Sequence, residues 1–405
     1  MKLWIKYLIA SVLGLAIGLF TPIGGPLLDT LSTVAVNMVR VMLVPLLLFS
    51  IPVAVHELHG DRKLLRTLTR TTIYSLLALL IFTLLGSGGA ILFSTTRIPL
   101  GNESGSLPEL PTIARLLETA FPANIFGVIA SSDYLLPVLL LGLVLGLAFS
   151  SEKNAAKPVL QLSDSLSRLS WQINSFILEL FPLPLVLLSA ARIGSIKAIP
   201  DLTPYARLFS LLGIEVAIAL IVLLPLVIFI ATKGKNPLRI LYALIAPAIT
   251  AVFTANYYAP AGILARHLKE SLGVRRRVGS VALPLAMMIG RPGTALVSAS
   301  SFIIILNSYS SLGLGPNAFL WILGMVPLSV LLSTAAPAAG PAACTAFLCA
   351  SYGKGFESGY LLILPIALPL QAIATFLDVL ILGTVTYLTA VGEHEAMHKE
   401  VRHYI

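Results

Sequence analysis

The sequence predicts an all-α membrane protein, and its composition and its apolar windows carry that prediction. Hydrophobic residues make up 57% of the 405 residues and charged residues only 11%, whereas a soluble domain carries about 25% charged residues. Several windows approach the roughly 20 apolar residues that one helical crossing needs, namely 3–20, 74–93, 134–149, 173–190, 208–231, 278–306 and 359–390. Helices are expected because lipid cannot satisfy exposed backbone groups.

The distribution of basic residues predicts the orientation in the membrane. They cluster in 62–70, 233–239 and 266–277, and Lys2, Lys6, Lys399 and Arg402 add basic ends. The loop 97–111 is instead rich in proline and mildly acidic. The positive-inside rule places the basic loops and both termini in the cytoplasm and that loop outside, which requires an even number of crossings. The net charge of +9 therefore reflects topology and does not predict a nucleic-acid partner.

Several other functions are not expected. The apolar run that follows Lys2 is long and lacks an Ala-x-Ala-like cleavage site, so it is interpreted as the first membrane helix and not as a signal peptide. Cys344 and Cys349 are too few and too close together for a disulfide framework or a zinc site. The sequence contains no GxSxG motif, and its HExxH match at 394–398 lies in the C-terminal tail, where the histidines are interpreted as solvated surface residues. An enzyme is therefore not expected.

The first half, to about residue 232, is interpreted as six ordinary spans. Arg40 lies near a span end, where its side chain can extend to the interface at little cost. Glu179 and Glu215 lie deeper, and an ionisable residue within a span is a functional candidate. A structural, hydrogen-bonded role is favoured for both, because neither belongs to a recognisable motif.

The second half has a different pattern. Segments 238–268 and 319–350 are apolar at both ends and broken at the centre, at 254–260 and at 333–341. Each is followed by one long span. Two broken segments at matching places in two repeats indicate a transporter binding site. We interpret them as re-entrant hairpins of inverted repeats; two kinked spanning helices are the alternative, but they would put Arg275, Arg276 and Arg277 outside.

The long span that follows the first hairpin contains MIGRPGTAL, residues 288–296. The span is predicted to be unwound at its centre, at Gly290, Pro292 and Gly293. A proline removes a hydrogen-bond donor from a helix, and a glycine permits unusual dihedral angles. Arg291 at the centre of a span costs about 2.5–3.5 kcal/mol on insertion scales and needs a partner. Asp378 in the final span is the expected partner. Either the two form an ion pair that fixes the helices, or Arg291 binds a substrate carboxylate and Asp378 orients it or meets a substrate ammonium.

Five segments together resemble the dicarboxylate/amino acid:cation symporters, a family that includes the glutamate transporters. They are VNMVRVMLVPLLLFSI at 36–51, FPANIFGVIASSDYLLPVLLLGLVLGLAFS at 121–150, ITAVFTANYYAP at 249–260, VALPLAMMIGRPGTAL at 281–296 and LLSTAAPAAGPAA at 331–343. The resemblance implies eight transmembrane helices, two re-entrant helical hairpins, a homotrimer and an elevator mechanism. It also implies a division into scaffold (1–66 and 99–204), transport domain (67–98 and 205–392) and cytoplasmic tail (393–405).

The chain departs from the family pattern at the expected site. Where the family has Asn-Met-Asp-Gly-Thr, this chain has Gly290-Arg291-Pro292-Gly293-Thr294. The best fit to the family's last helix places Gln371 and Thr375 at its acidic positions, Asp378 at its substrate-binding arginine, and Leu382 and Thr386 at its final asparagine and aspartate. An ungapped fit places Leu382 at the arginine. Because sodium prefers several oxygen ligands, some of them anionic, we expect that the protein does not use the family's sodium sites.

The expected function is secondary active transport of an amino acid or small dicarboxylate, coupled to protons or uncoupled. The alternatives are a sodium-coupled glutamate/aspartate symporter, an anion-conducting channel, or a homologue that binds without transporting. No cofactor is expected, with sodium possible. The partners are the substrate, the lipid bilayer and further copies in a homotrimer. The expected substrate-binding residues are Arg291, Thr294, Asp378, Asn256, Tyr257, Tyr258, Thr375, Gly340 and Pro341.

Overall fold

The computed structural model describes residues 2–20, 26–92, 97–98, 110, 112–129, 135–199, 201–309, 315–335 and 340–405. Within these ranges the chain is helical, and one isolated β-bridge joins Val274 and Ala396. The helices of the first half are α1 (Leu3–Phe20), α2 (Pro26–Arg40), α3 (Leu43–Gly60), α4 (Leu64–Leu92), α5 (Ile113–Ala120), α6 (Ile125–Ile129), α7 (Leu135–Ser151), α8 (Lys153–Leu180), α9 (Pro182–Lys197), α10 (Ala206–Ile218) and α11 (Leu224–Ala231). A π-helical turn, Ala219–Leu223, joins the last two.

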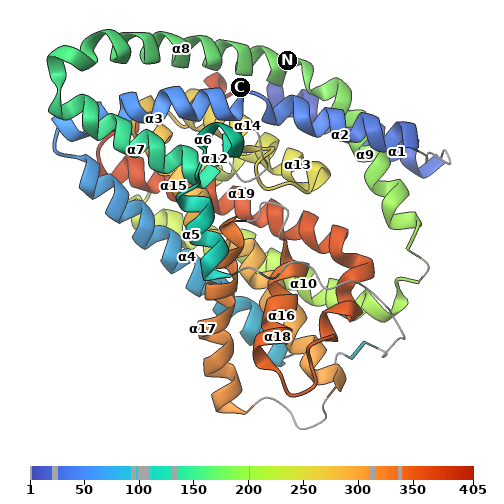
Figure 1. Cartoon of the computed structure of the whole chain (residues 1–405). Coiled ribbons are helices and arrows are strands. Elements are labelled where there is room, and N and C mark those ends of the chain that lie inside the picture. The colour runs from blue at the N-terminus through green and yellow to red at the C-terminus, as the bar shows by residue number, and fades with distance from the viewer. Residues whose placement is uncertain are drawn as a thin grey trace.

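The helices of the second half are α12 (Pro237–Ala243), α13 (Ile245–Thr254), α14 (Ala261–Glu270), α15 (Arg276–Ile289), α16 (Pro292–Tyr309), α17 (Pro316–Leu332), α18 (Pro341–Tyr352) and α19 (Ala367–Gly392). Short 3₁₀ turns span Thr203–Tyr205, Ser333–Ala335, Gly359–Ile366 and Val401–His403. Figure 1 shows α15, α16 and α19 running through the middle of the molecule, with the other helices around them.

The described helices include six that are long and apolar enough to cross a bilayer, or up to eight if each of two bent pairs counts as one span. The protein is therefore a multi-pass helical membrane protein, as its composition predicts. The window 173–190, expected to be one span, is divided: α8 ends at Leu180 and α9 begins at Pro182 after a bend of 56°. Pro182 and Pro184 explain the division, because prolines fit the first turn of a new helix better than the interior of an old one.

Glycines set the closest helix contacts of the first half. A Cβ on Gly14 of α1 would lie 2.3 Å from the Val186 carbonyl oxygen of α9. A Cβ on Gly146 of α7 would lie 2.5 Å from the Val55 Cβ of α3. Each glycine has a partner four residues away, at Gly18 and at Gly142, in the spacing that lets membrane helices approach closely. These two pairs make α1 with α9 and α3 with α7 closely packed units.

The first broken segment begins and ends at the same side of the molecule. α12 and α13 carry the chain inward with a bend of 47°, and α14 carries it back. Lys235 and Asn236, which precede α12, line the same cavity as Leu272, which follows α14. This is the arrangement of a re-entrant hairpin, and its tip covers residues 255–260.

The second broken segment has the same plan from the opposite side. Trp321 near the start of α17 and Tyr352 at the end of α18 have ring centroids 5.0 Å apart, so the two helices begin and end at one level. Residues 336–339 of the expected break lie outside the described residues. Figure 1 shows this end of α17 opposite the end where both chain termini are marked. The termini are neighbours, because Lys2 donates a hydrogen bond to the Val401 carbonyl over 3.1 Å.

Candidate functional site

The helix break is shorter than the sequence predicts. α15 ends at Ile289, Gly290 is extended with φ −111° and ψ 101°, and α16 begins at Pro292. The prediction that Pro292 and Gly293 are unwound is wrong, since both lie in the first turn of α16. A proline is well suited to the first helical position, because an N–H there would have no partner within the helix and the fixed φ of proline is already helical. Only Gly290 and Arg291 therefore interrupt the two helices.

Gly293 brings α16 into close contact with α19. A Cβ at this position would lie 2.3 Å from the Ala374 carbonyl oxygen and 2.6 Å from the Leu377 Cβ. No side chain fits there without movement of the backbone. The glycine that was expected to loosen the helix instead permits the contact between α16 and α19.

Asp378 of α19 binds the beginning of α16. Its Oδ1 accepts hydrogen bonds from the Gly293 amide at 2.7 Å and the Thr294 amide at 3.2 Å, and its Oδ2 accepts one from the Thr294 hydroxyl at 2.7 Å. Its side chain is fully buried. The first amides of a helix lack partners within the helix and carry a positive partial charge, so they stabilise a carboxylate placed there. The charge of the neighbouring Arg291 also favours the ionised Asp378.

Arg291 is also buried, with 1% exposure, and it stacks on the first hairpin. Its guanidinium carbon lies 4.2 Å from the centre of the Tyr257 ring, well within the range of a cation–π interaction. Such contacts are worth about 2 kcal/mol or more when desolvated, which offsets part of the cost of an arginine at this depth. The structure thus brings Arg291 and Tyr257 together, two of the residues expected at the site.

The Tyr257 hydroxyl lies against the carbonyl groups at the helix break. It is 3.0 Å from the Met287 carbonyl oxygen and 2.9 Å from that of Gly290, and its proton can be donated to either. These are carbonyls at the end of α15, where intrahelical partners are missing. In another protein such oxygens could ligate a cation; here a phenol occupies the position.

The hairpin tip is closed by its own asparagine. The Asn256 Oδ1 accepts hydrogen bonds from the Tyr258 amide at 2.9 Å and the Ala259 amide at 3.1 Å. Ala255 adopts the left-handed conformation, with φ 42°. The Tyr258 ring is buried with its centroid 5.7 Å from that of Tyr257. Asn256 therefore shapes the tip, and the two tyrosines fill its interior.

The remaining expected residues lie around α19. Thr375 lies within hydrogen-bonding distance, 3.1 Å, of the Ala251 carbonyl oxygen of α13. Gly340 precedes α18 and faces Gln371, whose Oε1 would lie 1.4 Å from a Cβ at Gly340. Pro341 begins α18, and its carbonyl accepts a hydrogen bond from Thr345 at 2.7 Å. The start of α18, the tip of the first hairpin and the break between α15 and α16 thus all adjoin α19 or its partners.

The sequence interpretation missed Arg192 of α9. Its Nε donates to the Phe253 carbonyl at 2.7 Å and its Nη2 to the Thr254 carbonyl at 2.6 Å. These carbonyls end α13, directly before the hairpin tip, so a cation there complements the helix dipole. The signal was present: Arg192 is a charged residue within the apolar run of α9.

The two acids singled out in the first half have different surroundings. The Glu179 side chain is 53% exposed and pairs with Arg266 at 3.1 Å. Glu215 of α10 is 1% exposed, and its two carboxylate oxygens lie 2.9 and 3.1 Å from the Ser300 hydroxyl of α16. Ser300 is the hydrogen-bond partner of Glu215 within the described ranges. Its hydroxyl also lies near the Leu296 and Gly86 carbonyls.

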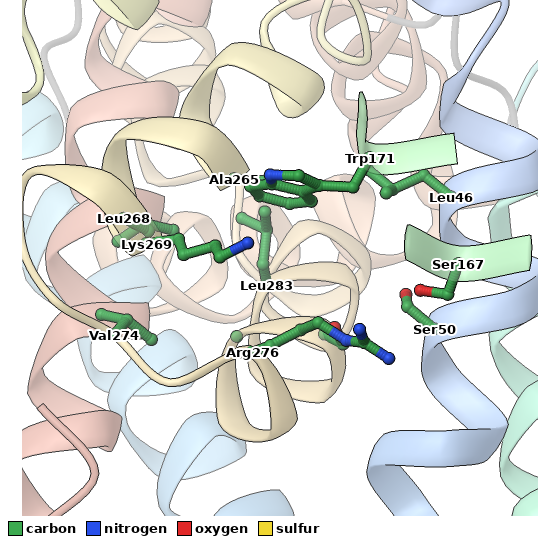
Figure 2. A pocket seen from close by; sticks show the side chains of 12 residues that line it. Leu46, Ser50, Ser167, Trp171, Ala265, Leu268, Lys269, Val274, Arg276 and Leu283 are labelled. Atoms are coloured by element: carbon green, nitrogen blue, oxygen red, sulfur yellow. The ribbon is translucent and has the colours of Figure 1, made fainter. Parts of the chain in front are cut away.

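A cavity of about 40 Å³ lies at the boundary between α3 and α8 on one side and α14 and α15 on the other. Figure 2 shows Ser50 and Ser167 on one side of this cavity and Leu283 and Arg276 on the other. The Lys269 ammonium lies 4.3 Å from the centre of the Trp171 ring, and Arg276 pairs with Asp164 of α8. The volume corresponds to roughly one or two water molecules, which is too small for an amino acid. The cavity is therefore a gap in a helix boundary and not a substrate site.

A family model described as "Sodium:dicarboxylate symporter family" matches residues 3–391. Among similar proteins, human "Excitatory amino acid transporter 2" is 31% identical over 164 residues, which are 40% of this chain and 28% of that protein. A Caenorhabditis elegans "Excitatory amino acid transporter" is 39% identical over 116 residues, 28% of this chain and 23% of that protein. Human "Neutral amino acid transporter A" is 28% identical over 179 residues, 43% of this chain and 33% of that protein. The matches thus span only about a quarter to a third of the relatives' lengths.

Proposed function

The chain belongs to the sodium:dicarboxylate symporter family, and from that membership we propose that it is a secondary active transporter for an amino acid or a small dicarboxylate. One observation carries this proposal. A re-entrant hairpin, the start of α18 and a two-residue helix break meet around α19, and a buried arginine lies in the break. Irregular backbone at membrane depth is tolerated where it is buried in protein or lines a cavity, and broken helices supply the binding groups of many transporters.

We assign Arg291 the role of binding a substrate carboxylate. Its guanidinium can form two parallel hydrogen bonds with a carboxylate, and its carbon lies 4.2 Å from the centre of the Tyr257 ring, which helps to hold it in place. Asp378 has the different role of fixing the start of α16, because it accepts hydrogen bonds from Gly293 and Thr294. A positioning role for Asp378 therefore has more support than contact with a substrate ammonium.

We further propose that transport does not use the family's sodium sites. A sodium ion at the Met287 and Gly290 carbonyls would have to displace the Tyr257 hydroxyl. It would also lie near the Arg291 guanidinium, and two unit charges 5 Å apart repel by about 3 kcal/mol at an effective dielectric constant of 20. The positions expected to supply ligands in the last helix carry Leu382 and Thr386, and neither side chain is anionic.

A proton is the coupling ion that this chain supports best, and Glu215 is its best candidate site. A buried carboxylate without a cation is costly, and it avoids most of that cost by taking up a proton. If Glu215 is protonated, it can donate to Ser300 while Ser300 donates to the Leu296 or Gly86 carbonyl; if it is ionised, the single hydroxyl proton is shared among four acceptors.

Other titratable groups lie far from Glu215 along the helices that surround it. Arg207 is eight residues away on α10, Arg291 and Tyr309 are each nine residues from Ser300, and Tyr74 is 12 residues from Gly86 on α4. At 1.5 Å rise per residue these separations are about 12 Å or more along the axes. Protonation of Glu215 is therefore governed by its own buried surroundings.

The mechanism we propose is the family's elevator, in a homotrimer within the cytoplasmic membrane with both termini in the cytoplasm. The scaffold would contain α1 to α3 and α5 to α9, and the moving part α4 and α10 to α19. The narrow cavity between α3, α8, α14 and α15 (Figure 2) then lies on the boundary along which the parts slide.

Uptake into proteoliposomes tests this proposal, with a sodium gradient, a proton gradient or neither imposed on the same preparation. The substrate is first identified by the rise in melting temperature that ligand binding produces, in a screen of amino acids and dicarboxylates. We expect accumulation driven by the proton gradient and unchanged by sodium. Strict sodium dependence would contradict the proposed coupling, conductance without substrate would indicate a channel, and binding without counterflow would indicate a non-transporting homologue.

Arg291→Met tests the carboxylate role separately. We expect it to remove substrate-induced stabilisation while the protein still elutes as a folded oligomer. If Arg291→Met instead prevents folding, Arg291→Lys provides the test, because it keeps the charge but loses the bidentate geometry. Unchanged substrate affinity in a folded Arg291→Lys protein would contradict the assignment.

A further inference from the structure

We propose that a basic pocket at the end of the molecule where both termini lie binds a phosphate group. It lies outside the site described above. Lys235 precedes α12 and Arg239 lies within it, and the C-terminal segment contributes His398 and Lys399. These four basic side chains converge on one cavity of about 140 Å³.

The cations of this pocket are not matched by acids. Within the described residues, Lys235, Arg239 and Lys399 form no ion pair within 4 Å. The acidic residues of the C-terminal segment are engaged elsewhere: Glu393 with Arg70, Glu395 with Lys63, Arg275 and Arg277, and Glu400 with Arg402. Several like charges around one cavity repel each other, so an anion that binds between them is stabilised by all of them.

The pocket has a fixed floor. Tyr404 is 7% exposed, and its ring stacks on that of Tyr242 with centroids 6.2 Å apart. Tyr387 of α19 and Leu272 complete the buried surface. Burial raises the pKa of Tyr404, while the nearby Arg239 charge opposes that rise. The Tyr404 hydroxyl therefore stays protonated and can donate a hydrogen bond to an anion.

The C-terminal segment is tied to the hairpin independently of any ligand. The Met397 amide donates to the Gly273 carbonyl at 2.9 Å, and the Ile405 amide donates to the Ser271 hydroxyl at 3.3 Å. Residues 396–405 thus pack against the exit of the first hairpin, while Lys235 and Arg239 lie at its entry. An anion in the pocket would connect the entry, the exit and the tail of the chain.

The volume of the pocket and its place at the membrane surface indicate the chemical class of its ligand. A cavity of 140 Å³ equals the liquid volume of roughly five water molecules, which is room for a phosphate group but not for a nucleotide. The pocket lies at the ends of membrane-crossing helices, where basic clusters meet anionic lipid headgroups. A phosphodiester of an anionic lipid and a free phosphate share the chemistry that this pocket recognises.

The test measures the melting temperature of the purified full-length protein in a non-ionic detergent. The probes are inorganic phosphate, dihexanoyl phosphatidylglycerol and, as the zwitterionic comparison, dihexanoyl phosphatidylcholine. We expect a saturable rise with phosphatidylglycerol, with phosphate or with both, but not with phosphatidylcholine. A rise with phosphatidylglycerol alone identifies a lipid headgroup, and a rise with phosphate identifies a soluble phosphate compound.

Two variants make the test specific. K235Q/R239Q should weaken the response at least tenfold in apparent Kd. K157Q/R402Q removes the same charge from residues that do not line the pocket and should respond as the wild type does; general stabilisation by phosphate salt would be equal in all three proteins. No saturable response in the wild type, or an equal loss in both variants, would overturn the proposal. If K235Q/R239Q fails to fold, K399Q replaces it, with R402Q alone as its control.

Discussion

Two acids of one stretch of chain, Asp378 within α19 and Glu395 just after it, are equally buried and are stabilised in opposite ways. The Asp378 carboxylate accepts hydrogen bonds from two amides and one hydroxyl at the start of α16. Glu395 is 1% exposed and pairs with Lys63, Arg275 and Arg277, from two other segments. Burial alone therefore does not predict the partner of a carboxylate. The loops at the end of the molecule surround Glu395 with long cations, whereas the hydrogen bonds to Asp378 come from the amides and the hydroxyl at the start of a helix.

The largest effect is expected from removing the central acid. Asp378→Ala leaves two amides and a hydroxyl without their acceptor in a buried site, and each orphaned donor costs about 1–3 kcal/mol. We expect a loss of about 3–5 kcal/mol of stability, measured by thermal or denaturant unfolding of the purified protein. Asp378→Asn keeps one carbonyl oxygen and should lose about half as much. Equal losses in the two variants would show that the negative charge, and not the hydrogen-bond geometry, stabilises α16.

The second effect concerns the acid at the end of the molecule. Glu395→Gln removes the charge that three cations share, and we expect a loss of about 2 kcal/mol, the value of one or two charge-assisted hydrogen bonds. Glu400→Gln is the control, because Glu400 is an exposed acid that pairs with Arg402. Its stability should lie within about 0.5 kcal/mol of that of the wild type, since exposed ion pairs contribute little.

The same cluster predicts a pH dependence. Burial raises the pKa of Glu395, but hydrogen bonds from Arg277 and Lys63 outweigh it and lower the pKa from 4.5 to about 2. The charged form is therefore favoured by folding, and its contribution is complete above pH 4.5 and lost as the pH falls from 4.5 towards 2. Melting temperatures across this range should fall more steeply for the wild type than for Glu395→Gln. Parallel curves would show that Glu395 does not carry the effect.

A smaller effect should follow from Tyr257→Phe, which sharpens the comparison at the membrane centre. It removes the hydroxyl from the Met287 and Gly290 carbonyls and should cost about 1–2 kcal/mol. If the phenol occupies a place suited to a cation, sodium should raise the melting temperature of this variant but not of the wild type. Tyr258→Phe, which leaves that hydroxyl in place, is the control. Sodium-induced stabilisation of the wild type would contradict the proposed coupling.

The smallest change in stability is expected at a third buried acid. Glu215→Gln keeps the shape and mimics the protonated form, so stability should change by less than about 0.5 kcal/mol, as for substitutions that remove no needed interaction. Exchange of substrate should continue, while accumulation driven by a proton gradient should disappear. Glu179→Gln, at the exposed acid of α8, should accumulate substrate normally. Proton-driven accumulation by Glu215→Gln would exclude Glu215 as the proton site.

The sequence predicted most of the apolar helices, the first broken segment and a helix break beginning at Gly290, because hydropathy and proline positions determine them locally. It extended that break two residues too far, and it predicted one span for the window 173–190, which is divided between α8 and α9. It did not predict which groups surround Asp378, since the partners of a buried acid depend on how α16 and α19 approach. The role of Gly293 was misjudged for the same reason: the close contact with Ala374 and Leu377 lies 81 or more residues away in sequence. Arg192 was missed because its partners are carbonyls, which any residue supplies.

Arg192 also affects the rate at which the first hairpin can separate from α9. If the first hairpin leaves α9 during transport, the bonds from Arg192 to the Phe253 and Thr254 carbonyls must break first. Two hydrogen bonds from a charged donor are worth about 3 kcal/mol or more, and about 1.4 kcal/mol is a tenfold change in rate. Under the proposed elevator mechanism, Arg192 would lengthen the dwell time of this conformation by roughly a hundredfold, through a contact that has no part in substrate binding.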